Sequence, residues 1–181
     1  MTTSPQILEL RQLLQQKGLG GALPKARPAD FEPAATGISS LDARLNGGLP
    51  RGGISEITGP SSSGRTSLAF AVLAAAGERE EMLAYIDAGD SFDPRSAQEA
   101  GIDFSRLLWV RCNVDSQPRY RQVALKRRQA DEAWQALNLV ASAGGFGVIV
   151  LDLADLPLQK LRRWQAQQWR RVTRAIEQTA T

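Results

Sequence analysis

The chain has 181 residues, enough for one domain with a hydrophobic core, and its hydrophobic (43%) and charged (23%) fractions are ordinary for a globular protein. It contains no histidine and one cysteine, which excludes a serine triad, a histidine-activated cysteine, an internal disulfide and a cysteine-rich zinc site. The net charge is +3, no apolar run approaches the roughly 20 residues of a membrane span, and the first residues lack the basic start and apolar block of a signal peptide, so we expect a cytoplasmic protein.

The first 36 residues are expected to form a separate N-terminal region. Apolar residues at helical spacing predict a short helix over residues 7–17, and the glycine- and proline-bearing run after it predicts a linker or extended arm. The compact domain is expected to span residues 37–181. Its first element, within residues 38–53, is a short helix closed by glycines and a turn.

From residue 54 onward, predicted strands and helices alternate. The expected strands are short apolar runs over residues 54–58, 82–88, 107–112 and 147–153. The expected helices cover residues 65–76, 93–101, a segment that ends at Gly144, and 157–178. The last strand, GVIVLDL, is nearly all apolar, so we expect it to be buried on both faces. The alternation predicts an α/β fold with a mainly parallel sheet flanked by helices.

The basic character of the chain is concentrated in the last helix. Residues 156–181 carry six lysines and arginines against Glu177 alone, whereas the rest of the chain has 16 basic and 18 acidic residues. On a helical wheel the apolar side chains share one face. The arginines cover the opposite face and its flanks: Arg162, Arg163, Arg170, Arg171 and Arg174. Two interpretations stay open, a core-packing helix with a solvated basic back or an electrostatic surface for nucleic acid or an acidic partner.

The stretch GPSSSGRTS, residues 59–67, has nearly the spacing of a phosphate-binding loop. The pattern G-x-x-x-x-G-K-[ST] has lysine where this chain has Arg65. A predicted strand precedes the stretch and a predicted helix follows it, the context in which backbone N–H groups cradle a phosphate. Thr66 occupies the position of a magnesium-binding hydroxyl, and Asp152 ends an apolar strand. The candidate nucleotide-binding residues are Gly59, Pro60, Ser61, Ser62, Ser63, Gly64, Arg65, Thr66, Ser67 and Asp152.

Three stretches, in this order, resemble the core of RecA-type recombinases: TGISSLDARLNGGLPRGGISEITGPSSSGRTSLAFAVLAAA, YIDAGDSFDPRSAQEAGID and GVIVLD. The resemblance covers roughly residues 36–155. Within the superfamily the chain most resembles the ImuA-type RecA-like proteins that accompany error-prone translesion synthesis operons. It implies a RecA-like P-loop core preceded by a helix on an extended arm. That arm is similar to the family's polymerisation element, so four apolar residues are candidates for contact with a partner or a second copy, or for packing on their own domain: Ile7, Leu10, Leu13 and Leu14.

The sequence departs from the RecA-type pattern at four positions that the family uses. Ser61 replaces a glutamate, Arg65 the phosphate lysine, Gly89 the glutamate that orients the attacking water, and Ser96 the aromatic residue that stacks on adenine. The planar fork of arginine fits a tight loop poorly. The missing glutamate removes the positioning of water, and the missing aromatic costs base affinity of ~1–3 kcal/mol. We therefore expect no catalytic residue, no metal site and no cofactor, with ATP and magnesium as the open alternative. In an empty loop, Arg65 is expected to pair with Asp152 or Asp87.

These observations lead to the hypothesis of a catalytically degenerate RecA-like accessory protein of the DNA-damage (SOS) response. It would support translesion synthesis at the bacterial nucleoid through contact with RecA or an error-prone polymerase. The alternatives are an active ATP-dependent, DNA-binding recombinase relative and a RecA-related inhibitor of cell division. In RecA-type proteins further strands follow the basic helix. We therefore expect either a C-terminally truncated chain or a minimal protein whose sheet edge is left for a partner.

Overall fold

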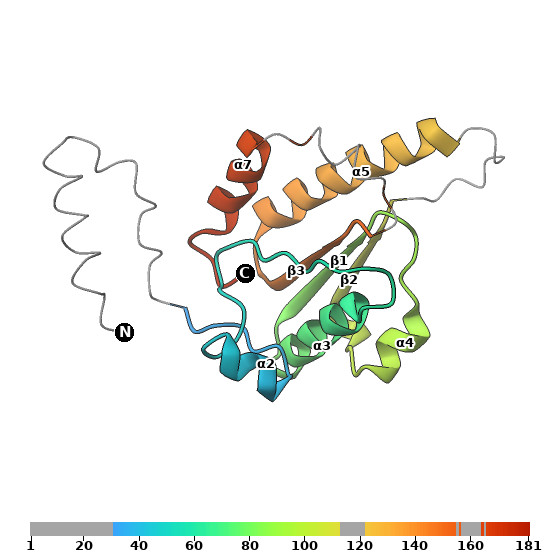
Figure 1. Ribbon diagram of the computed structural model, residues 1–181. Coiled ribbons are helices and arrows are strands. Elements are labelled where there is room, and N and C mark those ends of the chain that lie inside the picture. The colour runs from blue at the N-terminus through green and yellow to red at the C-terminus, as the bar shows by residue number, and fades with distance from the viewer. Residues whose placement is uncertain (1–30, 113–121, 155, 157–163, 165) are drawn as a thin grey trace, which may run out of the picture. The chain divides into compact units, whose positions relative to one another are not determined.

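Figure 1 shows the computed structural model, in which a small sheet lies between two layers of helices. The structure describes residues 31–112, 122–154, 156, 164 and 166–181, with the backbone alone at 122–128. Residues 31–181 form one compact unit. The helix expected over residues 7–17, with its candidate contact residues Ile7, Leu10, Leu13 and Leu14, lies outside the described residues, and the domain boundary at residue 37 stays a prediction.

The sheet has three parallel strands in the order β2-β1-β3. Strand β1 is Met82–Asp87, β2 is Leu107–Arg111 and β3 is Phe146–Asp152. Tyr85, near the middle of the central strand, lies opposite Trp109 of β2 and Val150 of β3. Parallel neighbours require long crossover connections, and the helices between the strands supply them. The predicted α/β fold with a parallel sheet is confirmed.

Helices cover both faces of this sheet (Figure 1). Their bounds are Ser39–Arg44 (α2), Arg65–Glu78 (α3), Pro94–Glu99 (α4), Gln122–Ala143 (α5) and Ala166–Ile176 (α7). One hydrophobic cluster joins α3 and α4 to the sheet: Phe70, Leu73, Ala76, Leu83, Tyr85, Phe92, Ala97 and Ile102. A second joins α5 and α7 to the other face: Ile86, Ala88, Cys112, Ala130, Ala133, Leu137, Ala141, Leu156, Val172 and Ile176. In the described part of the chain, no helix is long and apolar enough to cross a membrane.

The prediction of a strand over residues 54–58 is wrong. These residues form neither a helix nor a strand and lie outside the sheet, and Ile54 and Ile57 are 43% and 37% exposed. The two isoleucines are three positions apart and point to opposite sides of an extended chain, and the other three residues are polar, so neither side offers a continuous apolar face. The backbone just before this segment is also held elsewhere, because the Gly52 N–H donates to the carbonyl of Thr181 at 2.6 Å.

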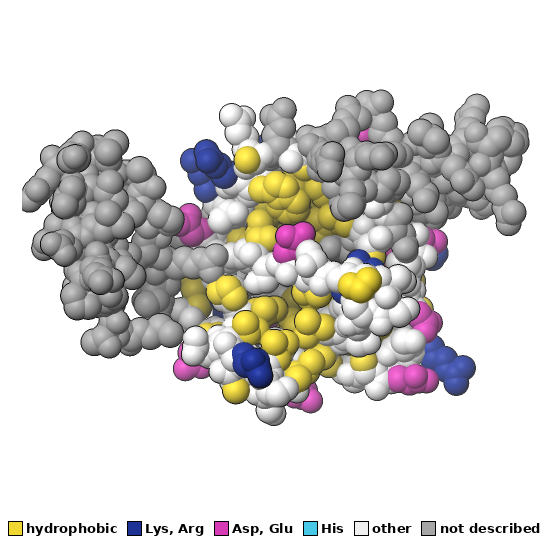
Figure 2. Space-filling model, viewed as in Figure 1, with side chains coloured by type: hydrophobic (Ala, Val, Ile, Leu, Met, Phe, Trp, Pro, Cys, Tyr) yellow, Lys and Arg dark blue, Asp and Glu magenta, His cyan; other side chains and the backbone are white. Residues whose placement is uncertain are grey.

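Strand β3 is covered on both faces, as predicted, but it is an edge strand among the described residues and its burial is only partial. All seven of its residues are only partly buried. Its Val148 and Val150 pack toward the α3 side, and Ile149 and Leu151 toward the α5 side. Figure 2 shows hydrophobic side chains gathered on both sides of the backbone that leads from α2 to α3. The apolar sequence of β3 thus reflects two packed faces, but the unpaired 54–58 segment leaves its outer edge open.

Candidate functional site

The loop Gly59–Ser67 leads into α3 and is open to solvent. Residues 59–64, Thr66 and Ser67 are exposed and Arg65 is half-buried. Gly64 precedes the first residue of α3 in the left-handed conformation (φ 86°), which glycine adopts without steric cost. The N-terminus of the 14-residue helix therefore lies at the end of this loop, where unpaired N–H groups and the helix dipole favour an anion. The helix expected after the loop is present, whereas the strand expected before it is not.

Asp152 ends β3, and each of its carboxylate oxygens accepts a hydrogen bond. The Tyr85 hydroxyl donates to Oδ2 at 2.5 Å, and the backbone N–H of Ala154 donates to Oδ1 at 2.9 Å. No ion pair or hydrogen bond joins Arg65 to Asp152 or to Asp87 in the part of the chain that the structure describes, so the internal pairing expected for an empty loop is wrong. Asp152 acts in the fold as the acceptor that closes the end of its strand.

Asp87 ends β1 directly opposite Asp152 and is fully buried. Its Oδ1 accepts from the backbone N–H of Ser91 at 2.9 Å. Its Oδ2 accepts from the N–H of Phe92 at 3.0 Å and from Trp109 Nε1 at 3.3 Å. These donors replace the water that a buried carboxylate loses. The carboxylate of Asp87 therefore organises the turn that follows β1.

A family model for the RecA N-terminal domain matches residues 10–156. The chain belongs to this family. The match spans the Gly59–Ser67 loop, β1 and β3, and it stops before α7. The parallel sheet flanked by helices is consistent with a RecA-like core.

Two positions of the RecA-type pattern can now be placed in the fold. Gly89 is the position predicted to lack the family's water-orienting glutamate. The next residue, Asp90, forms a double contact with Arg111, at 2.7 Å to Nε and 3.0 Å to Nη2. Hydrogen bonding to Asp90 and its charge raise the pKa of Arg111. Ser96 is the position predicted to lack the family's stacking aromatic residue, and its hydroxyl donates to Asp93 at 2.5 Å within the first turn of α4. Asp90 and Ser96 thus both take part in local structural contacts.

In a RecA-type ATPase site a magnesium ion would be held by a loop hydroxyl and a strand-end carboxylate, whose counterparts in this chain would be Thr66 and Asp152. All four carboxylate oxygens of Asp87 and Asp152 already accept hydrogen bonds from the protein. The described part of the chain holds no group of three or more acidic or cysteine side chains placed to bind a metal. Asp87 and Asp152 thus have structural roles in the fold, and the expectation of no metal site stays a prediction.

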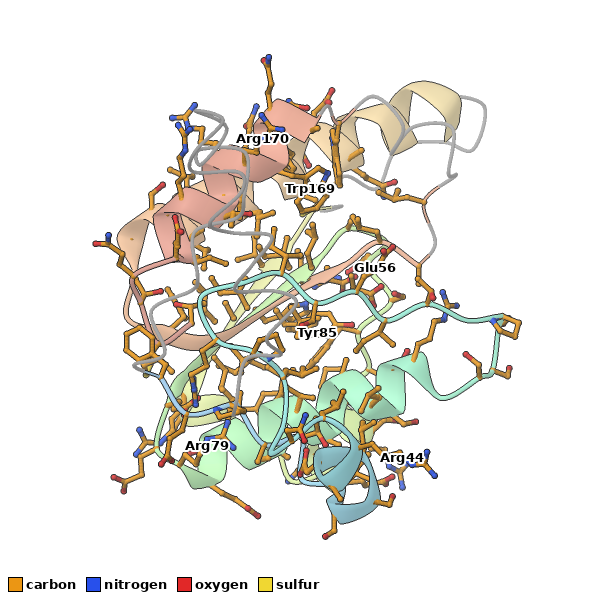
Figure 3. All side chains as sticks on the ribbon, turned by 60° about the vertical axis from the view of Figure 1, so that its left-hand side comes forward. Arg44, Glu56, Arg79, Tyr85, Trp169 and Arg170 are labelled. Atoms are coloured by element: carbon orange, nitrogen blue, oxygen red, sulfur yellow. The ribbon has the colours of Figure 1, made fainter. Side chains whose placement is uncertain are left out.

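Helix α7 presents different chemistry on its two sides. Val172 and Ile176 are buried, whereas Arg170, Arg171 and Arg174 are exposed. Figure 3 shows Arg170 pointing away from the sheet. The apolar side joins a cluster of three tryptophans, Trp134, Trp164 and Trp169, whose ring centroids are 5.0–5.7 Å apart. The predicted amphipathic pattern is confirmed for α7, while Arg162 and Arg163 lie outside the described residues.

Sequence reasoning did not identify Tyr85 as part of this region. Its ring is 1% exposed and packs among the aromatic side chains under α3, in contact with Phe70 and Phe92. A signal was present, because alternation along a strand places residues 85 and 87 on the same face of the sheet. What the sequence could not show is the register that places the Tyr85 hydroxyl at Asp152 on the neighbouring strand.

Proposed function

We propose that this protein is a catalytically degenerate RecA-like accessory protein of the DNA-damage response, which supports translesion synthesis by contacting RecA or an error-prone polymerase. The main support for the proposal is that the carboxylates of Asp87, Asp152 and Asp90 all accept hydrogen bonds from other groups of the fold. A RecA-like core is retained while the carboxylates that would serve ATP hydrolysis hold its turns and strand ends together.

Phosphoryl transfer depends on positioning the attacking water and on neutralising the charge of the phosphate. Gly89 offers no carboxylate for the water, and the Asp90 side chain is held by Arg111. Arg65 is the first residue of α3, so its positive charge adds to that of the helix N-terminus. The loop therefore retains a positive charge for a phosphate, without a base positioned to act on the attacking water. These features support an adaptor in preference to an ATP-driven motor.

The exposed side of α7 is the contact surface that we propose. Among the described residues, no ion pair involves Arg170, Arg171 or Arg174, whereas Arg51, Arg79 and Arg111 are paired with carboxylates. Unpaired arginines are available for bidentate contacts with the carboxylates of a protein or the phosphates of a nucleic acid. The two kinds of partner differ in salt dependence, because each neutralised phosphate steepens the fall of DNA affinity with salt.

A pull-down against purified RecA and the translesion polymerases tests the proposal. The triple variant R170A/R171A/R174A should lose the partner while keeping its fold, because these side chains make no ion pair in the described part of the chain. The matched control is Arg44→Ala, which removes an exposed arginine from α2 at a different place on the molecule (Figure 3). No capture of any of these proteins by the wild-type chain would count against the proposal, as would equal capture by the triple variant and the control.

A further inference from the structure

We propose that the turn at Arg51 and Gly52 fixes the position of α7 and thereby positions the basic contact surface that this helix carries. The inference rests on the proposed function, because it names the residues that hold that surface in place. The turn lies between α2 and α3, far from α7 in the sequence, and Figure 1 shows the end of the chain beside this stretch of backbone. Arg51 and Gly52 are therefore positioning residues and not part of the contact surface itself.

Gly52 allows the backbone of the turn to approach the end of α7 closely. It is buried, and its backbone is left-handed (φ 65°). A Cβ atom at this position would lie 2.9 Å from the carbonyl oxygen of Glu177 and 3.4 Å from that of Ile176. The N–H of Gly52 donates to the carbonyl of Thr181 at 2.6 Å. Any other residue would therefore strain the turn and push the end of α7 away.

The side chain of Arg51 joins the segment that follows α7 to the start of the sheet. It is 10% exposed and forms an ion pair with Glu81, directly before β1, at 2.5 Å. The same guanidinium donates to the carbonyl of Gly147, at the start of β3, at 3.4 Å, and to the carbonyl of Ala180. One planar fork thus reaches three segments at once. A lysine could not replace it, because its three donors share one nitrogen.

The packing of α7 against the sheet and α5 is apolar. Val172 and Ile176 are buried, and the ring centroid of Trp169 lies 5.0 Å from that of Trp134 on α5. Apolar packing is non-directional, whereas hydrogen bonds and ion pairs fix a direction. Loss of the contacts at residues 51 and 52 should therefore leave the core folded while α7 shifts and its three exposed arginines lose their common orientation.

Hydrogen exchange followed by mass spectrometry tests the inference on Arg51→Ala and Gly52→Ala. Amides of α7 should exchange roughly tenfold faster than in wild-type protein, while those of α3 and β1 keep their rates. Near-UV circular dichroism should also change, because it reports the packing of the tryptophan rings on α7 and α5. The matched control is Arg79→Ala. Arg79 also binds Glu81, at 2.9 Å, but its other bond is to the carbonyl of Ala35, so its removal should leave α7 unchanged.

Unchanged exchange of α7 in the folded variants would overturn the inference, as would equally fast exchange in Arg79→Ala. If Arg51→Ala does not fold, Arg51→Lys takes its place, with the same expected and contradicting results. In the pull-down, Arg51→Lys should bind the partner several-fold more weakly than Arg79→Ala, and equal capture by the two would contradict the positioning role. No capture by wild-type protein counts against the proposed function alone, because the exchange of α7 is measured without a partner.

Discussion

Asp87 and Asp152 lie directly opposite each other at the carboxyl ends of adjacent parallel strands, and both carboxylates are held by donors from their own chain. Asp87 has two backbone donors and an indole, and Asp152 has a tyrosine hydroxyl and one backbone N–H. Residues in these positions are usually read as catalytic machinery in a nucleotide-binding protein. In this fold they stabilise the turns that follow the two strands, so their removal should lower the stability of the protein.

Asp87→Ala should lower the free energy of unfolding by roughly 1–3 kcal/mol, because it leaves the N–H groups of Ser91 and Phe92 and the indole of Trp109 without their buried acceptor. Urea unfolding followed by circular dichroism measures the change. The matched control is Asp90→Asn, three residues along the same turn, which removes the ion pair with Arg111 while keeping a side chain that tolerates the left-handed backbone of residue 90 (φ 56°), and it should have a much smaller effect. Equal effects for the two variants would contradict the structural role of Asp87.

Glu81 should make stability depend on pH below neutrality. Burial raises its pKa, but hydrogen bonds from Arg79 and Arg51 outweigh burial and hold the pKa below the usual 4.5. A carboxylate with a lowered pKa in the folded state stabilises the fold above its unfolded pKa, and that contribution is lost as the pH falls through the folded value. Between pH 7 and pH 3, Glu81→Gln should therefore lose less stability than wild-type protein in urea titrations. Parallel losses in the two proteins would show that the ion pairs of Glu81 contribute nothing.

Cys112 should be unreactive in the native state. It is 5% exposed, and burial, with smaller contributions from the charges of Glu132 and Asp87, raises the pKa of its thiol to about 11. Thiolate is the reacting form, so at pH 8 both access and ionisation oppose modification. A disulfide reagent should label the native protein slowly and the urea-unfolded protein at once. Rapid labelling of native protein would mean that the packing around α5 opens readily.

Ile57→Ser should change stability by less than about 1 kcal/mol, because Ile57 is exposed and lies outside the sheet. Ile149→Ser, on β3, should cost about 2–3 kcal/mol, since that side chain packs against the cluster under α5. Thermal or urea unfolding of the two variants provides the comparison. A large loss for Ile57→Ser would show that residues 54–58 are part of the sheet.

Patterns of apolar residues and caps predicted most of the described elements. The alternation of β and α segments predicted the parallel sheet. The helix predicted over residues 93–101 corresponds to α4, where the Asp93 side chain accepts from the N–H groups of Arg95 and Ser96. The segment 54–58 was mispredicted because strand propensity does not say whether a neighbour is available. The backbone beside it is bound instead to the end of the chain, and Thr181 Oγ1 donates to the carbonyl of Phe146 at 2.7 Å.

The sequence predicted less of the candidate site than of the fold. The departures at positions 61, 65, 89 and 96 were predicted from residue types within the spacing of the RecA-type pattern, and they stay predictions. The contacts of the carboxylates that remain could not be read. They depend on strand register, which sets Tyr85 against Asp152, and on the turn that brings two N–H groups to Asp87.

The most direct test of the central claim is ATP turnover by wild-type protein and Arg65→Ala, with and without single-stranded DNA. A catalytically degenerate accessory protein predicts that both proteins stay at the background rate under every condition. Turnover by wild-type protein that Arg65→Ala abolishes would contradict the account and identify an ATP-dependent motor.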